Sequence, residues 1–219
     1  MGEIWQVIRT YQNPPLGEAL AAHLRLSVCA LLLGIAIAIP LAIIASRSAL
    51  ASLVAVNISN VGRALPSLAV LALALPFLGL GFRPALLALT VLCIPPILIN
   101  AAVGLREVDS MVVESARGMG LSNTQILTRI RLPIALPVIF AGVRTAAVQV
   151  VASATLATFI GGGGLGDVII GGLSTNRTAV LLAGAIPVAV LAMLTELFFA
   201  ALERGFTPRG LRLAEQRTS

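Results

Sequence analysis

The stretch "LRLSVCALLLGIAIAIPLAIIA" (residues 24–45) carries a single charge, Arg25. A helix needs about 20 mostly apolar residues to cross the hydrocarbon core of a bilayer. A strand of a membrane barrel would instead alternate polar and apolar residues over about 10 positions. The stretch therefore predicts a membrane-spanning helix.

The rest of the chain has the same character. Of its 219 residues, 58% are hydrophobic, whereas soluble domains average about 45–50%. The fold class predicted is an all-α integral membrane protein with about five transmembrane helices. Further spans are predicted at residues 52–80, 84–105, 134–160 and 179–202.

Two of these spans contain helix breakers. Region 52–80 holds Leu65-Pro66-Ser67, and proline disfavours helix both at its own position and at the one before it. We expect this span to be bent or interrupted. Region 84–105 is predicted to be broken at Pro95-Pro96, ahead of Asn100.

The distribution of arginine predicts the orientation. All fifteen basic residues are arginine, and cytoplasmic loops carry the excess of positive charge. The larger group is placed inside the cell: Arg47, Arg106, Arg117, Arg129, Arg131, Arg204, Arg209, Arg212 and Arg217. The smaller group is placed outside: Arg9, Arg25, Arg83 and Arg177.

This orientation divides the chain into three parts. Residues 1–23, with Trp5 and Tyr11, form an external or interfacial segment with the N-terminus outside. Residues 24–203 form the transmembrane domain, with a cytoplasmic loop at 106–133. Residues 204–219 form a cytoplasmic tail.

Several kinds of chemistry are excluded or disfavoured. The chain has no lysine, so it cannot form a Walker A site for ATP.

Cys29 and Cys93 lie in apolar runs, where a thiol behaves as a small hydrophobe. His23 is the only histidine and is expected to have an interfacial or hydrogen-bonding role. No metal-ligand spacing, nucleophile triad or paired carboxylates are found, so we expect no metal and no catalytic residue.

The loop between the third and fourth spans reads "EVDSMVVESARGMGLSNTQILTRIRLP" (residues 107–133) and is longer than a connector requires. The pattern predicts a helix, a glycine bend at Gly118 and Gly120, and a second short helix capped by Ser122. Pro133 suits the first turn of the next span. Val108, Met111, Val112 and Ser115 fall at helical spacing.

The same loop fits the pattern E-A-A, three residues, G, nine residues, I, one residue, L-P. This resembles the loop of permease subunits in binding-protein-dependent ABC importers, with Ser115 as the one departure. The resemblance implies a coupling helix at about 121–129 that contacts a separate ATPase. The coupling residues it implies are Glu114, Ser115, Ala116, Gly120, Leu121, Ser122, Ile130, Leu132 and Pro133.

The resemblance also implies partners. ATP and Mg²⁺ would be bound by the ATPase subunits, and this chain would hold no cofactor. A second permease, identical or related, and an extracytoplasmic substrate-binding protein would complete the importer, within membrane lipid and without nucleic acid. The chain would then be a transport subunit and no enzyme.

"FIGGGGLGDVIIGGL" satisfies G-x-G-x-x-G at Gly161, Gly163 and Gly166. A dinucleotide site also needs a preceding strand and an acid about 20 residues later, and neither is present. We expect a flexible external loop, which in the resembling permeases lies near the gate and the binding-protein contact. Pathway or gate positions hypothesised are Pro66, Ser67, Asn100, Gly163 and Gly164.

Arg63, Arg144 and Glu196 are charges in apolar regions, where ionisable groups are costly. They are predicted to snorkel and to form a pair within the protein. A gate or pathway contact is the alternative.

Several segments resemble one branch of these importers, which carries glycine betaine, choline or carnitine. They are "HLRLS" (23–27), "ALPSLAVLAL" (64–73), "ARGMG" (116–120), "LPIALPVIFAGVRTAAV" (132–148), "ATLATFIGGGGLGD" (154–167) and "TPRG" (207–210). Arg63 departs from this branch. Methionine-type permeases share the "GGGGLGD" segment and the five-span plan, so the resemblance implies a methionine-importer-like permease fold, and an importer for methionine or another small amino-acid-like solute is the alternative.

Two further classes remain open. A channel or secondary transporter would recruit polar groups such as Asn57, Asn60, Asn100 and Glu196, but would leave residues 107–133 without a role. An intramembrane enzyme would need a nucleophile such as Ser67 or Ser153.

Overall fold

The computed structural model describes residues 14–206, which form a bundle of helices. The predicted all-α fold class is confirmed. Predictions that concern residues 1–13 and 207–219 lie outside the described residues. These are the roles of Arg9, Trp5 and Tyr11, the outer part of the C-terminal tail with Arg209, Arg212 and Arg217, and the "TPRG" segment.

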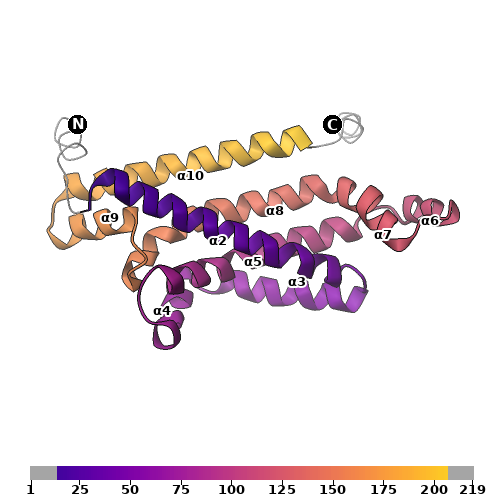
Figure 1. Cartoon of the computed structure of the whole chain (residues 1–219), viewed down its shortest axis with the longest axis horizontal. Helices are drawn as coiled ribbons and strands as arrows, with labels where there is room; N and C mark the ends of the chain where they lie inside the picture. The colour runs from indigo at the N-terminus through magenta and orange to yellow at the C-terminus, as the bar shows by residue number, and fades with distance from the viewer. Residues whose placement is uncertain (1–13, 207–219) are drawn as a thin grey trace.

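Four helical runs are long and apolar enough to cross a membrane. They run roughly along the long axis of the molecule (Figure 1). Three are α2 (Leu16–Ala45), α5 (Phe82–Arg106) and α10 (Thr178–Phe206). The fourth, Asn123–Ile160, is centred on α8 (Leu132–Ser153) and ends in the 3-10 helix η2 (Ala154–Ile160).

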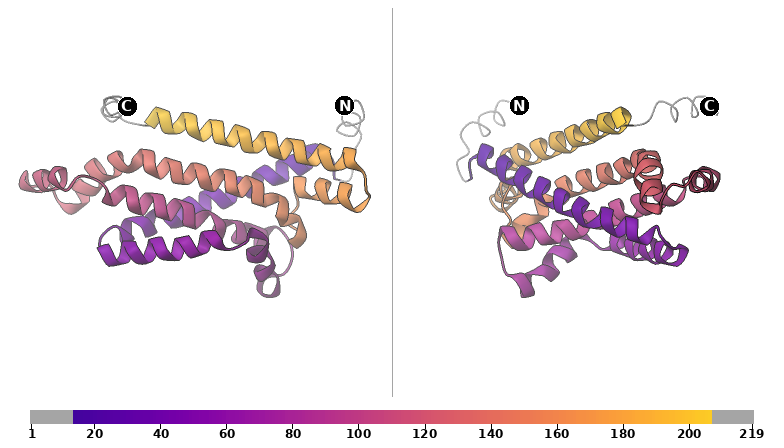
Figure 2. Two further views of the ribbon diagram at one scale, coloured as in Figure 1. Left: turned by 180° about the vertical axis from the view of Figure 1, so that it is seen from behind. Right: turned by 45° about the vertical axis from the view of Figure 1, so that its right-hand side comes forward.

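A fifth span is present only as a bent pair. Helices α3 (Ala49–Ala64) and α4 (Ser67–Leu78) meet at 93°, and α4 turns away from the other helices (Figures 1 and 2). Leu65 has an extended backbone, with φ −69° and ψ 128°, because the ring of Pro66 disfavours helix at the preceding residue. The predicted interruption is confirmed.

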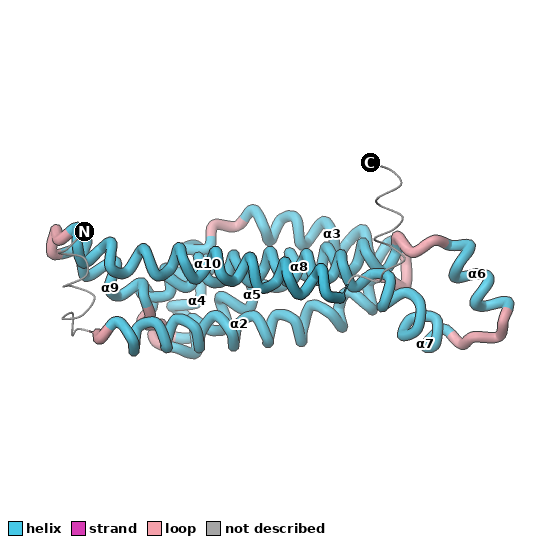
Figure 3. Tube along the Cα trace, turned by 90° about the horizontal axis from the view of Figure 1, so that it is seen from above, coloured by secondary structure: helices cyan, strands magenta, loops and turns pink. Residues whose placement is uncertain are grey.

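Helix α5 forms the centre of the bundle. It packs against α2, α3, α4 and α8, whereas α10 packs against α8 and α9 (Leu165–Ser174); the views in Figures 2 and 3 show this arrangement. A side chain at Gly34 of α2 would collide with Cβ of Cys93 on α5. Small residues of this kind allow membrane helices to approach closely.

The predicted break at Pro95-Pro96 is wrong, because α5 runs through both prolines. Two glycines on neighbouring helices make room for them. A Cβ at Gly62 of α3 would lie 3.0 Å from Pro95 Cγ, and one at Gly142 of α8 would lie 2.9 Å from the Pro96 carbonyl oxygen. That oxygen also accepts a hydrogen bond from Asn100 Nδ2 at 2.8 Å. Close packing by small residues thus accompanies the continuous path of α5 through the two prolines.

Two helical segments differ from the prediction. Helix α2 begins at Leu16 rather than at residue 24, directly after Pro15. The stretch predicted as a flexible loop contains a turn at residues 161–164, and then helix α9 (Leu165–Ser174). The loop prediction is therefore wrong for its second half.

The outer faces of the bundle are apolar. Phe77 on α4 is 84% exposed, and large side chains on α2, α3 and α10 are more than half exposed, among them Leu32, Ile44, Leu53, Ile58 and Leu197. In water a protein with such a surface would aggregate, whereas lipid or an apolar protein partner can cover the surface without a hydrophobic penalty. The described helices thus have the surface of a multi-pass membrane protein.

Candidate functional site

The loop between α5 and α8 folds into structure of its own. It contains α6 (Ser110–Gly118), α7 (Asn123–Ile126) and the π-helical turn η1 (Leu127–Arg131). After the role that the family resemblance implies, we call Glu107–Pro133 the coupling segment. Its helices α6 and α7 project from one end of the bundle, the end toward which α10 finishes (Figures 1 and 3). The predicted helix, bend and second helix are confirmed.

The first helix is stopped by a glycine cap. Gly120 has φ +86°, a region that L-residues rarely adopt. The N–H of Leu121 donates to the Ala116 carbonyl at 3.2 Å, and that of Gly120 donates to the Arg117 carbonyl at 3.0 Å. This pair of bonds is the Schellman motif, which satisfies the last carbonyls of a helix. A Cβ at Gly120 would meet nothing within 4 Å. Glycine is therefore favoured here by the backbone conformation and not by a lack of space within this chain.

The second helix begins with a capping box. The N–H of Gln125 donates to Ser122 Oγ at 3.3 Å, and the N–H of Ser122 donates to Gln125 Oε1 at 2.8 Å. Two N–H groups that lack helical partners are thereby satisfied. The predicted cap at Ser122 is confirmed.

Helix α7 is joined to the membrane helix without a break. The helical run extends over 38 residues from Asn123 to Ile160. Where α8 begins, the N–H of Leu132 donates to the carbonyl of Leu127, five residues earlier. This bond makes η1 a π-helical turn just before Pro133. Pro133 lies in the first turn of α8, as predicted. A displacement of α7 would therefore be passed directly to α8.

A small apolar core holds the coupling segment together. Val108, Val113, Ala116 and Ile126 are each at most 7% exposed, and Leu121 packs against them. Of the residues noted at helical spacing, only Val108 is buried. Met111, Val112 and Ser115 are exposed.

The residues implied by the family pattern therefore divide by position. Ala116 is buried in the small core at 1% exposure. Partly buried members are Leu121, Ile130, Leu132 and Pro133, and exposed members are Glu114, Ser115, Gly120 and Ser122. Met119, which the family pattern does not include, is an exposed residue of the bend, at 74% exposure. Its position between two glycines was the available signal.

The hypothesised pathway residues lie in separate places. Pro66 and Ser67 lie at the bend between α3 and α4. Asn100 is at the contact between α5 and α8, where a Cβ at Gly142 would lie 2.7 Å from Asn100 Cβ. Gly163 and Gly164 have φ of +74° and +104° in the turn before α9. The described contacts do not bring these three places together.

The turn at residues 161–164 is tied to its surroundings. The N–H of Gly81 donates to the Ile160 carbonyl at 2.7 Å, and Thr158 Oγ1 donates to Asp167 Oδ1. A Cβ at Gly164 would lie 3.2 Å from His23 Cβ. His23 is fully buried, and its Nε2 donates to the Val151 carbonyl at 3.0 Å. The hydrogen-bonding role predicted for His23 is confirmed.

One predicted intramolecular pair is present. Arg144 Nε on α8 lies 3.4 Å from Glu196 Oε1 on α10, and Arg144 Nη1 lies 3.1 Å from Glu203 Oε2. Both contacts join α8 to α10. Arg63 is exposed in the last turn of α3 and has no part in it.

Of the arginines assigned to the two ends of the bundle, those within residues 14–206 lie at the predicted ends: Arg47, Arg106, Arg117, Arg129, Arg131 and Arg204 at the end of the coupling segment, and Arg25, Arg83 and Arg177 at the other. At one end Arg106 Nη1 donates to the Ala49 carbonyl at 3.2 Å. At the other end the guanidinium of Arg25 lies 4.8 Å from the centre of the Phe82 ring, a cation–π contact.

Comparison with known proteins assigns these features to a family. A family described as "Binding-protein-dependent transport system inner membrane component" matches residues 30–208. The carnitine transport permease protein OpuCB of Listeria monocytogenes is 44% identical over 194 residues, which is 89% of each chain. The choline transport system permease protein OpuBB of Bacillus subtilis is 40% identical over 87% of this chain and 88% of its own.

A solved structure shares the fold. A chain from inward-facing conformations of the MetNI methionine ABC transporter superposes with a TM-score of 0.78 at 22% identity. The match covers 88% of this chain and 96% of that chain.

Proposed function

This chain belongs to the family of inner membrane components of binding-protein-dependent transport systems, and from that premise we propose that it is the permease subunit of an ATP-driven importer for a quaternary-amine osmoprotectant. The solutes meant are glycine betaine, choline and carnitine. One observation carries the proposal, the 44% identity over 89% of both chains to a carnitine permease.

The methionine alternative has weaker support. Its solved representative shares the fold at 22% identity, and a fold hosts many functions. Osmoprotectant permeases are 35–44% identical to this chain. Since only 4% of residues are aromatic, an aromatic cage for a quaternary ammonium belongs in the substrate-binding protein.

The proposed mechanism uses the coupling segment as the attachment point of the ATPase. The ATPase subunits bind ATP and Mg²⁺, because this chain has no lysine for a Walker A loop. Movement of the ATPase against α7 passes into α8 through the continuous run 123–160. Rigid movement of α8 against the other helices then opens the pathway to one side at a time.

The proposed orientation has the coupling segment in the cytoplasm and the turn at 161–164 outside, facing the binding protein. The excess of arginine at the coupling end supports this, since cytoplasmic loops are enriched in basic residues. A second permease, identical or related, is proposed to complete the pathway. The exposed apolar faces of α3, α4 and α10 support the presence of such a neighbour within the lipid.

Reconstitution tests the proposal. The chain, its ATPase and its binding protein are placed in liposomes with ATP, and uptake of labelled glycine betaine, choline, carnitine and methionine is compared. We expect uptake of a quaternary amine that requires all components. Methionine uptake alone would favour the alternative, and uptake without ATPase would indicate a channel or secondary transporter.

A further inference from the structure

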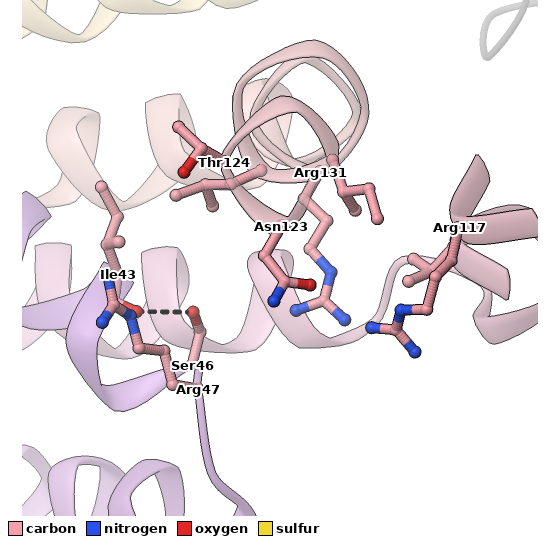
Figure 4. A pocket seen from close by; sticks show the side chains of 10 residues that line it. Ile43, Ser46, Arg47, Arg117, Asn123, Thr124 and Arg131 are labelled. Atoms are coloured by element: carbon pink, nitrogen blue, oxygen red, sulfur yellow. Dashed lines mark hydrogen bonds between the residues drawn. The ribbon is translucent and has the colours of Figure 1, made fainter. Parts of the chain in front are cut away.

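A polar pocket of about 550 Å³ lies between the α2–α3 turn and the coupling segment (Figure 4). Three arginines line it: Arg47 from the turn, Arg117 from α6 and Arg131 from η1. In Figure 4 the guanidinium groups of Arg117 and Arg131 point into the same opening, beside Asn123. We call it the arginine pocket.

No carboxylate of the described chain neutralises this charge. The lining residues include no Asp or Glu, and the ion pairs described within residues 14–206 are both formed by Arg144. Arg131 Nε is shielded from solvent and has no hydrogen-bond partner. A buried donor without a partner is costly, so Arg131 is poised for an acceptor that the chain does not supply.

The chemistry of the lining selects a phosphate group. Guanidinium groups present paired N–H donors that match the oxygens of phosphate in two parallel hydrogen bonds. Asn123 and Thr124 add neutral donors, whereas the Ser46 hydroxyl already donates to the Ile43 carbonyl at 2.9 Å. Ligand pockets of about 300–1,000 Å³ hold small molecules, so the volume allows a phosphate with an attached glycerol.

The position of the pocket identifies a source for that phosphate. Helix α2 carries no charge from Leu26 to its end at Ala45, and Ser46 and Arg47 follow it, so the pocket begins where a membrane span gives way to polar residues. Phospholipid headgroups lie at this level, and basic pockets there bind anionic lipids. Ile43 and Leu127 also line the pocket and provide apolar surface next to the charge.

We propose that the arginine pocket binds a phosphate group, presented by an anionic phospholipid or free in solution. Bound phosphate would bridge the α2–α3 turn and the coupling segment, which are far apart in sequence. This ligand is distinct from the transported solute. The proposal rests on the proposed function in one respect only, which is the placement of the pocket at the cytoplasmic leaflet. Its test needs no transport.

The experiment measures lipid binding by the full chain purified in a neutral detergent. Phosphatidylglycerol and zwitterionic phosphatidylcholine are added in equal amounts, and the lipids retained are counted by native mass spectrometry. We expect preference for phosphatidylglycerol, reduced about tenfold in Arg131→Gln because two charge-assisted hydrogen bonds are lost. Arg117→Gln should act in the same direction. Arg131→Lys, which keeps the charge but loses the paired geometry, should be intermediate.

Arg129→Gln is the matched control, because Arg129 is exposed on the same turn and does not line the pocket. A second arm replaces lipid with inorganic phosphate and follows thermal unfolding against chloride at equal ionic strength. Stabilisation of the wild type that is lost in Arg131→Gln, without a lipid preference, would assign free phosphate as the source.

Three results would overturn the proposal. One is the absence of both lipid preference and stabilisation by phosphate. Another is a lipid preference reduced equally by Arg129→Gln, which would show only a general effect of charge. The third is lipid preference unchanged in Arg131→Gln while binding of the ATPase is lost, which would assign the arginines to a protein contact. Elution of each variant as the wild type in gel filtration verifies folding.

Discussion

The backbone N–H of Leu121 donates to the carbonyl of Ala116 at 3.2 Å, and this bond closes the bend on which the coupling segment turns. The bond requires Gly120 between them to hold φ +86°. The bend sets the direction of α7 and of the continuous helix behind it, through which the proposed mechanism transmits movement of the ATPase.

Gly120→Ala should reduce ATP-driven uptake because alanine resists the backbone conformation of the bend. Holding an L-residue there costs about 1–2 kcal/mol, which lowers the population of the native bend roughly 5- to 30-fold. Uptake in proteoliposomes measures the effect. Gly118→Ala is the control, since a Cβ at Gly118 also meets nothing within 4 Å and Gly118 is helical. Equal uptake by both variants would contradict this role for the bend.

Gly120→Asp tests partner approach separately from the backbone. Asp tolerates positive φ better than Ala, so the loss caused by the backbone is smaller. If an ATPase surface lies against Gly120, the added carboxylate should weaken ATPase binding more than Gly120→Ala does, as measured by co-purification. Stronger binding by Gly120→Asp than by Gly120→Ala would argue that no partner lies close to this position.

Ala116→Leu should damage the coupling segment even when no ATPase is present. Ala116 is 1% exposed, and overpacking a filled core costs about 1–3 kcal/mol. Ser115→Leu, on the exposed face of the same helix, is the control. Limited proteolysis of the isolated chain should cut residues 107–133 faster in Ala116→Leu alone. Equal rates would contradict the packing assigned to Ala116.

Ser122→Ala should loosen the start of α7 by removing the hydroxyl that accepts from Gln125. Loss of such a cap costs about 1 kcal/mol. Hydrogen exchange at the Gln125 amide should accelerate about fivefold, and Ser122→Asn should restore the wild-type rate because Asn also caps. Unchanged exchange in Ser122→Ala would show that the capping box does not hold α7.

Arg144→Gln should lower the thermal stability of the purified chain, because it leaves the Glu196 carboxylate without its arginine. Both side chains belong to membrane-spanning helices, where a carboxylate left without its arginine is costly. The double variant Arg144→Gln/Glu196→Gln should therefore unfold at a higher temperature than Arg144→Gln alone. Strictly additive losses would indicate that the two side chains do not interact.

Local chemistry made much of the fold predictable. Pro66 restricts its own backbone and that of Leu65. The three residues Leu65-Pro66-Ser67 were therefore enough to predict the bend between α3 and α4. Ser122 and Gly120 define a cap and a bend through contacts within five residues. These features need no knowledge of the tertiary structure.

Long-range packing accounts for the errors. The path of α5 through Pro95-Pro96 depends on Gly62 and Gly142, which lie on other helices. Helix α9 has only ten residues, too few to form reliably alone, and it is held by α10 and α2. The burial of Ala116 and the meeting of three arginines from the α2–α3 turn, α6 and η1 in the arginine pocket likewise follow from contacts that no local pattern encodes.

The side of the membrane on which the coupling segment lies decides whether a cytoplasmic ATPase can bind it, and cysteine labelling measures that side directly. Ser115→Cys and Ser174→Cys make the same exchange at exposed positions, on α6 and at the end of α9. Each variant is treated in intact cells with a membrane-impermeant maleimide, with Cys29 and Cys93 replaced by alanine. A cytoplasmic coupling segment predicts labelling of Ser174→Cys, and labelling of Ser115→Cys only after the membrane is opened. Labelling of Ser115→Cys in intact cells, with Ser174→Cys protected, would contradict it.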